Sequence, residues 1–296
     1  MESYEFLLFL AIILFATKIC GLFSRKFHMP QVVGALLAGV ILGPSVLNLI
    51  SFDGATGSYL EITAEIGVIL LMFSAGLETD LTELKENGVA SFITAGIGVL
   101  VPLFGGFLSY ALYFHTDFGD FMEVLKAVFV GVVLTATSVS ITVETLRELG
   151  KLKGRVGTTI LGAAVIDDIM GIIVLTVVTS IEDTSVNPLT VLLKIVLYFI
   201  VIAIVAFVMF KCKKLIEGAG EKRRVTIFAI AFCFLLSYVS EQFFGIADIT
   251  GAYFAGLMLC NMKIGDYIKA RAEVPSYLLF SPVFFASIGI KTQLEG

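Results

Sequence analysis

The chain has 296 residues, of which 58% are apolar and only 15% are charged, and its mean hydropathy is +0.99. This composition excludes a soluble globular protein, because the outer shell of such a protein must be polar. The net charge of −5 gives no sign of a nucleic-acid partner. The four cysteines form neither a CxxC motif nor a Cys/His cluster, so they predict no metal site.

Apolar segments of about 20 residues recur along the chain, and this is the length that a helix needs to cross ~30 Å of hydrocarbon. They predict an all-α polytopic membrane protein with ten spans, including the first segment, which lacks the basic start of a signal peptide. The predicted spans cover residues 6–23, 31–50, 59–77, 88–113, 124–146, 155–181, 189–210, 224–243, 248–262 and 275–290. With the N-terminus outside, nearly all Lys and Arg residues between the spans lie on inward loops, as the positive-inside rule requires.

Two pairs of spans share a small-residue pattern. Val33–Leu42 and Thr250–Leu259 have the frame G-A-x-x-A-G-x-x-L, and Gly76–Leu81 matches Gly289–Leu294. The second and ninth spans cross in opposite directions, which indicates the inverted repeat of many secondary transporters. Two repeats of six spans around a connector predict thirteen spans in all, of which ten are present. The glycines of these patterns are interpreted as sites of close helix packing, within the chain or at a dimer interface.

Asp167 and Asp168 lie in the middle of the sixth predicted span. A charge at that depth costs at least ~2.5–3.5 kcal/mol, so the pair predicts a function. Adjacent helical residues point about 100° apart, so one carboxylate is expected to face an ion cavity and the other to be held by a buried partner. The alternative is a structural pair satisfied by hydrogen bonds between helices. Glu65 and Glu144, in or near other spans, are further candidates for an ion path.

The fifth predicted span holds dense hydroxyl side chains near its middle, including Thr135, Thr137, Ser138 and Ser140. They are expected to weaken helical order, and a break within the membrane is tolerated only where the backbone is buried or lines a cavity. An unwound segment would offer carbonyl oxygens to a cation and a positive helix end to the Asp carboxylates. The alternative is a regular helix whose hydroxyl groups bond to the preceding turn.

With these residues, the chain resembles the monovalent cation/proton antiporters, in the branch of bacterial sodium/proton exchangers and Kef-type potassium/proton systems. The resemblance rests on Thr135–Val143, Leu146–Leu152, Ala163–Asp168, Gly76–Leu81 and Phe284–Gly289.

This resemblance implies that Asp168 binds the ion and the proton, and that Asp167 pairs with a lysine in electrogenic members. It also implies that Thr135–Ser140 is the unwound half of a pair of crossing helices. Residues 1–81 and 223–296 would form a dimerisation scaffold, 82–187 an ion-binding core that moves as an elevator, and 188–222 a connector span with a basic loop. The second crossing helix and the lysine would follow Gly296, so the chain would hold the scaffold and half of the core.

We therefore expect a secondary active transporter, not an enzyme, that exchanges sodium or lithium for protons with Asp168 alternately protonated and cation-bound. The expected partners are a monovalent cation, the proton, membrane lipid and a second copy of the chain, without a cofactor. The expected location is a prokaryotic inner or plasma membrane. Two alternatives remain open: potassium/proton exchange of the Kef type, and a truncated, non-transporting or channel-like form.

Overall fold

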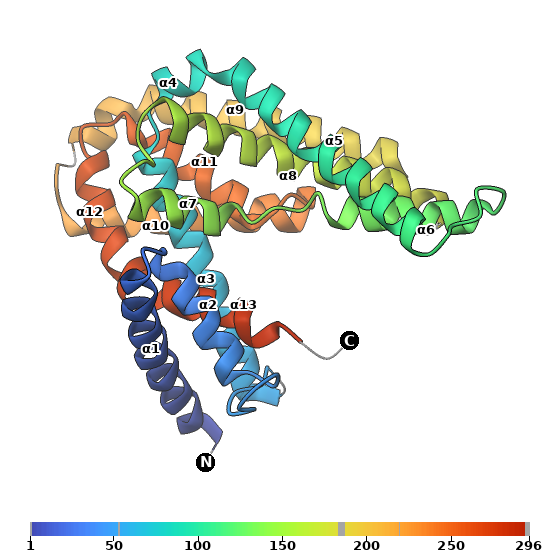
Figure 1. Cartoon of the computed structure of the whole chain (residues 1–296). Coiled ribbons are helices and arrows are strands. Elements are labelled where there is room, and N and C mark those ends of the chain that lie inside the picture. The colour runs from blue at the N-terminus through green and yellow to red at the C-terminus, as the bar shows by residue number, and fades with distance from the viewer. Residues whose placement is uncertain (1, 53, 183–186, 219, 294–296) are drawn as a thin grey trace.

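A computed structural model of the chain describes residues 2–52, 54–182, 187–218 and 220–293. Within these residues the regular structure is helical, with short turns between the helices (Figure 1). The elements in chain order are α1 (Glu2–Lys26), α2 (Gln31–Leu42), α3 (Gly54–Glu78), α4 (Leu81–Glu86), α5 (Gly88–Tyr113), α6 (Phe121–Val133), α7 (Val139–Glu148), α8 (Arg155–Glu182), α9 (Pro188–Gly218), α10 (Arg223–Val239), the π-helical turn η1 (Ser240–Phe244), α11 (Asp248–Cys260), α12 (Gly265–Pro275), the π-helical turn η2 (Ser276–Phe280) and α13 (Ser281–Lys291).

The apolar helices agree in position with the predicted spans. Among the described residues, seven helical stretches are long and apolar enough to cross a membrane: α1, α3, α5, α8, α9, α10 with η1, and α12 through α13. The other three predicted spans overlap the shorter apolar helices α2 and α11 and the pair α6 and α7. The second span was predicted too long, because α2 ends at Leu42 and residues 43–50 form turns and irregular chain. The chain is therefore a helical membrane protein, while the number of crossings stays a prediction.

Two stretches that were expected to be loops are helical. The basic loop was predicted to begin at residue 211, but α9 continues through Lys211, Lys213 and Lys214 to Gly218. Similarly, α12 is helical before the tenth predicted span and continues through η2 into α13. Long basic side chains can keep their charged ends in water while the helix continues, so a group of Lys residues does not by itself end a helix.

Asp80 fixes the short connection after α3. Its carboxylate accepts hydrogen bonds from the backbone N–H groups of Thr82 and Glu83, and so caps the start of α4. These donors stabilise the charged form and hold the pKa of the Asp80 carboxyl below its usual value. The connection therefore joins the end of α3 to the start of the short helix α4 through only two residues, Thr79 and Asp80.

The small-residue patterns pack helices together within the chain. α2 packs along α13, and α3 packs along α11. A Cβ atom at Gly39 would overlap a carbonyl of α13 and lie 2.9 Å from the Cα atom of Gly289. A Cβ atom at Gly76 would overlap a carbonyl of α11 and lie 3.1 Å from the Cα atom of Gly256. We call these two contacts, Gly39–Gly289 and Gly76–Gly256, the glycine seam.

The glycine seam demonstrates the inverted repeat in three dimensions. The sequence patterns align Gly39 with Gly256 and Gly76 with Gly289. If Gly39 and Gly289 are replaced by their equivalents in the other repeat, the result is Gly256 and Gly76, which form the second contact. This exchange is what a two-fold relation between the repeats requires. The close-packing interpretation of these glycines is confirmed, and the packing is between helices of one chain.

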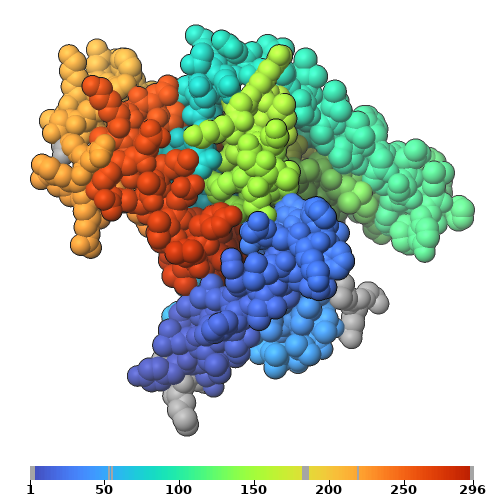
Figure 2. Space-filling view, turned by 60° about the vertical axis from the view of Figure 1, so that its left-hand side comes forward, coloured from blue at the N-terminus to red at the C-terminus, as the bar shows by residue number. Residues whose placement is uncertain are grey.

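The helices fall into two sets, and α7 and α9 each contact both of them. α5 contacts α6 and α8, and in Figure 1 these three helices extend together away from α1, α2 and α3. Figure 2 shows the C-terminal helices, in red, against the N-terminal helices, in blue, in agreement with the contacts of α13 with α1, α2 and α3. α7 follows α6 in the chain but contacts α2 and α3 as well as α8.

Candidate ion-binding site

The fifth predicted span is broken at its middle. α6 ends at Val133 and α7 begins at Val139, and the segment between them is not helical. Ser138 has an extended backbone (φ −87°, ψ 103°), and its hydroxyl oxygen accepts a hydrogen bond of 3.3 Å from the N–H of Ile141. A serine in this conformation is a favoured helix N-cap. The predicted break is therefore confirmed, and Ser138 begins its second half.

The hydroxyl groups around the break have different partners. Thr135 is buried, and its Oγ1 donates a hydrogen bond of 2.7 Å to the carbonyl oxygen of Val132, three residues earlier. This is the bond to the preceding turn that the regular-helix alternative expected. Thr137 instead reaches another helix, where its Oγ1 donates 2.7 Å to Oδ2 of Asp167. Ser140 is buried on the first turn of α7. Of these four side chains, Thr137 is thus the one with a hydrogen bond to the Asp pair.

The two aspartates of α8 have unequal surroundings. Asp167 is only 8% exposed, and while its Oδ2 is held by Thr137, its Oδ1 is buried without a hydrogen-bond partner among the described residues. Asp168 is partly exposed, and no hydrogen bond or ion pair joins it to another residue of the described ranges. Thr137 holds Asp167, while the expectation that Asp168 faces an ion cavity stays a prediction.

This arrangement is chemically suited to a cation or a proton. Two adjacent carboxylates in an apolar helix repel each other, and a buried charge without a partner is costly. Either a bound cation or a proton on Asp168 removes part of that cost. The N-terminal end of α7, next to Thr137, adds a partial positive charge on the side of Asp167.

The two glutamates proposed for an ion path lie elsewhere. Glu65 is exposed on α3, and Glu144 is buried on α7, where its Oε2 lies 3.2 Å from Nη1 of Arg147. No hydrogen bond or ion pair within the described part of the chain joins either glutamate to Asp167 or Asp168.

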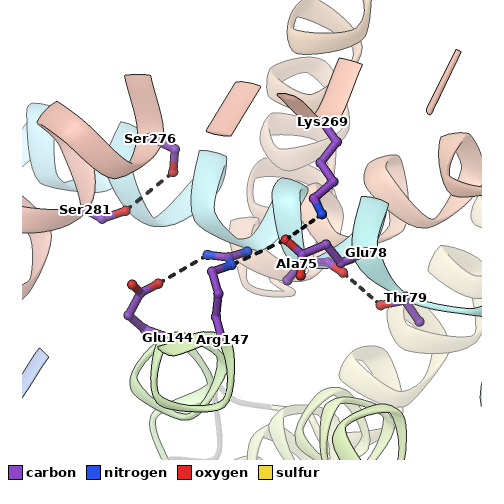
Figure 3. Close-up of polar contacts among 8 residues, drawn as sticks. All are labelled: Ala75, Glu78, Thr79, Glu144, Arg147, Lys269, Ser276 and Ser281. Carbon is purple, nitrogen blue, oxygen red and sulfur yellow. Dashed lines mark hydrogen bonds and ion pairs between the residues drawn. The ribbon is translucent and has the colours of Figure 1, made fainter. Parts of the chain in front are cut away.

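A second polar cluster was not predicted from the sequence: Glu78, Arg147 and Lys269 come together from three helices (Figure 3). Arg147 and Lys269 were assigned to loops, where charges are usually solvated. The position of Glu78 at the end of an apolar span, within a repeated motif, was the one available signal.

Comparison with known proteins places the chain among antiporters. Residues 10–296 match the family model described as "Sodium/hydrogen exchanger, transmembrane". The chain is 40% identical over 289 residues to the "Probable Na(+)/H(+) antiporter GerT" of Bacillus cereus, which covers 97% of this chain and 74% of that protein. It is 38% identical over 296 residues to the "Na(+)/H(+)-K(+) antiporter GerN" of Bacillus cereus, covering 99% of this chain and 73% of that protein.

A solved structure supports the same fold. The sodium proton antiporter MjNhaP1 from Methanocaldococcus jannaschii, determined at pH 8, matches with a TM-score of 0.68 and 20% identity. The match covers 99% of this chain and 72% of that one. The fold is thus the inverted-repeat antiporter fold, with a broken helix beside an intramembrane Asp pair. The chain belongs to the sodium/hydrogen exchanger family.

Proposed function

We propose that this chain exchanges sodium or lithium ions for protons across a prokaryotic cell membrane, with Asp168 binding the proton and the cation in turn. One observation carries the proposal: Asp168 is a partly exposed carboxylate in the middle of the apolar helix α8, next to a second carboxylate that is buried and bonded to Thr137. The names of the relatives, most of them Na(+)/H(+) antiporters, support the same assignment.

Coupling follows from competition at one carboxylate. A protonated Asp168 carries no charge and does not attract a cation, whereas a bound cation excludes the proton. Asp167 lies next to Asp168 on α8, and Thr137 donates a hydrogen bond to one of its carboxylate oxygens. Such a second carboxylate is what an electrogenic exchange would use. Carbonyl and hydroxyl oxygens of residues 134–140, Thr135, Ser138 and Ser140 among them, would replace water around the ion.

Alternating access is proposed to come from movement of a core, residues 82–187, against a scaffold formed by residues 1–81 and 223–296. Two observations support this division. The glycine seam packs α2 and α3 against α13 and α11 with backbone in contact, so these helices act as one body. α5, α6 and α8 contact one another, and α7 links them to the scaffold. The proposal includes a homodimer, with lipid on the remaining apolar surface and the N-terminus outside.

Potassium is the second candidate ion. The name of the relative GerN, a Na(+)/H(+)-K(+) antiporter, includes potassium as well as sodium. The oxygen atoms offered by the broken helix come largely from backbone and hydroxyl groups, and their chemistry does not select one alkali cation. Comparison of lithium, sodium and potassium in one assay would separate the candidates.

The test is a flux assay in sealed vesicles that contain the purified chain and a pH-sensitive dye. An inward sodium gradient should drive protons out of wild-type vesicles, and Asp168→Asn should abolish that flux. Asp120→Asn is the matched control: it makes the same chemical change at the N-cap of α6, where asparagine caps equally well. Flux that persists in Asp168→Asn would remove Asp168 from the mechanism. Large unitary currents would identify a channel instead.

A further inference from the structure

Charged side chains of α7 and α12 meet at Glu78 of α3, which both helices contact (Figure 3). Nε of Arg147, on α7, lies 3.5 Å from Oε1 of Glu78, on α3. Nζ of Lys269, on α12, lies 3.3 Å from the same oxygen. Glu144, one turn before Arg147 on α7, places its Oε2 3.2 Å from Nη1 of Arg147. Glu273 of α12 also lies against Glu78.

These side chains are mostly removed from solvent. The side chains of Glu78 and Glu144 are 7% and 6% exposed, and that of Arg147 is 12% exposed. A buried ion pair is costly to break when one charge is left without a partner. Separating Arg147 of α7 from Glu78 of α3 is therefore costly unless each of these two charges keeps another partner.

The cluster meets that condition. If α7 moves away from α3, Arg147 keeps Glu144, which is on its own helix, and Glu78 keeps Lys269, which is on the scaffold side. The contact between Arg147 and Glu78 can thus open without leaving either charge buried and alone. A permanent structural bridge would not need this second set of partners.

The position of α7 connects the cluster to the Asp pair. The ten residues of α7 run from the Ser138 cap, next to Thr137 and its bond to Asp167, to the turn that holds Arg147. Beyond Arg147, Oε2 of Glu148 accepts a hydrogen bond of 2.6 Å from the backbone N–H of Gln31 at the start of α2. Both ends of this short helix are therefore held, one at the ion site and the other at the scaffold.

We propose that the Arg147–Glu78 pair is a reversible tie that holds α7 against the scaffold in the conformation described here, making Arg147 a positioning residue for the exchange. This inference rests on the proposed function, because it requires α7 to move with the core. Lys291 and Glu61 provide a contrast. They pair α13 with α3, which the glycine seam and neighbouring contacts hold in one body, and both are about half exposed.

The experiment measures how often α7 leaves the scaffold. Ala35, buried on α2, lines a cavity of about 280 Å³ together with Glu144 and Glu148 of α7. A cysteine at this position, in a chain whose native cysteines are replaced by serine, should react faster with a maleimide when α7 separates from α2. The native positions to be replaced are Cys20, Cys212, Cys233 and Cys260.

Arg147→Gln and Glu78→Gln should each raise the alkylation rate of Ala35→Cys by about threefold or more, and the double variant should react no faster than the faster single one. Lys269→Gln should lower the rate, because opening would then leave the Glu78 carboxylate without a cationic partner. Lys291→Gln, the matched control, should leave the rate unchanged. A decrease in Lys269→Gln is a result that general loosening of the fold cannot produce.

Three results would overturn the tie: unchanged rates in both single variants, single effects that multiply in the double variant, or a faster rate in Lys269→Gln. If Arg147→Gln does not fold, Glu78→Gln tests the same contact from the scaffold. Alkylation needs no transport, so a wild-type chain without sodium-driven proton flux would refute the proposed function and leave this readout intact. Conversely, normal flux with unchanged alkylation rates would refute only the tie.

Discussion

The glycine seam and the broken-helix site are opposite solutions to the same membrane environment. In the seam, helices approach until backbone meets backbone, and a single added Cβ atom would overlap a neighbouring carbonyl. At the broken-helix site, a stretch of backbone is not helical, one carboxylate oxygen of Asp167 has no partner among the described residues, and Asp168 remains open.

The difference shows which region of the fold is tightly packed and which region leaves polar groups without partners. Small residues in the seam gain dispersion contacts at close range, which stabilise helix packing in a membrane. Unsatisfied polar groups at the other region cost free energy and persist only where they serve a ligand or another state. Changes in the seam should therefore act on stability, whereas changes at the site should act on transport.

The largest expected effect is the loss of stability when a glycine of the seam is replaced by alanine. Gly39→Ala should destabilise the chain by about 3 kcal/mol, because its new Cβ atom would overlap the backbone of α13, which cannot move aside as a flexible side chain can. The repeat-related change Gly256→Ala should cost about the same. Thermal unfolding in detergent measures both.

Gly96→Ala is the control for these changes, because a Cβ atom at Gly96 of α5 meets no other atom within 4 Å. It should stabilise the chain by about 0.5–1 kcal/mol, the usual gain in helix propensity. Equal melting temperatures for Gly39→Ala and Gly96→Ala would contradict the role of the seam.

An intermediate effect is expected at Thr137. Thr137→Val keeps the shape of the side chain but removes the donor to Asp167, and a hydrogen bond to a charged group contributes about 1.5–3 kcal/mol. Sodium-driven proton flux should fall by about tenfold or more, since 1.4 kcal/mol corresponds to a factor of ten. Thr142→Val, which removes a hydroxyl bonded to the carbonyl of Ser138 within α7, should leave the flux nearly unchanged. Similar losses in both variants would mean that Thr137 supports the helix and not the Asp pair.

The smallest expected effect is the loss of stability when the N-cap of α7 is removed. Ser138→Ala removes the cap of this ten-residue helix and should destabilise the chain by about 1 kcal/mol. Ser138→Asn should restore most of the loss, because asparagine is an equally good cap. A fully stable alanine variant would show that packing, and not the cap, sets where α7 begins.

Sequence patterns predicted these two regions for different physical reasons. The seam was visible because a close helix contact requires Gly at fixed positions, and the repeat places the same requirement on Gly39 and Gly256. The break was visible because hydroxyl and β-branched residues are dense at one point of an apolar span. The cost of intramembrane charge identified Asp167 and Asp168 without any knowledge of the fold.

Other features had no local signal. Thr137 was one of several equivalent hydroxyls until the fold brought it to Asp167. The pairing of Arg147 with Glu78 joins residues far apart in sequence. Each lies just beyond the end of a predicted span, where a charged side chain is expected to be solvated. The π-helical turn η1 ends the helix that α10 begins, and η2 joins α12 to α13; the apolar pattern of these segments predicts neither turn. Contacts between distant segments depend on helix orientation, which the periodicity of a single span does not determine.

The most direct measurement is proton release on sodium binding. Purified chain in weakly buffered detergent solution is mixed with sodium chloride, and the pH change is recorded against an equal addition of choline chloride. Competition at Asp168 predicts that wild-type protein releases protons, saturating with sodium, and that Asp168→Asn releases none. Equal release by Asp168→Asn, or sodium-driven flux without release by the wild type, would contradict the claim that one carboxylate binds both ions.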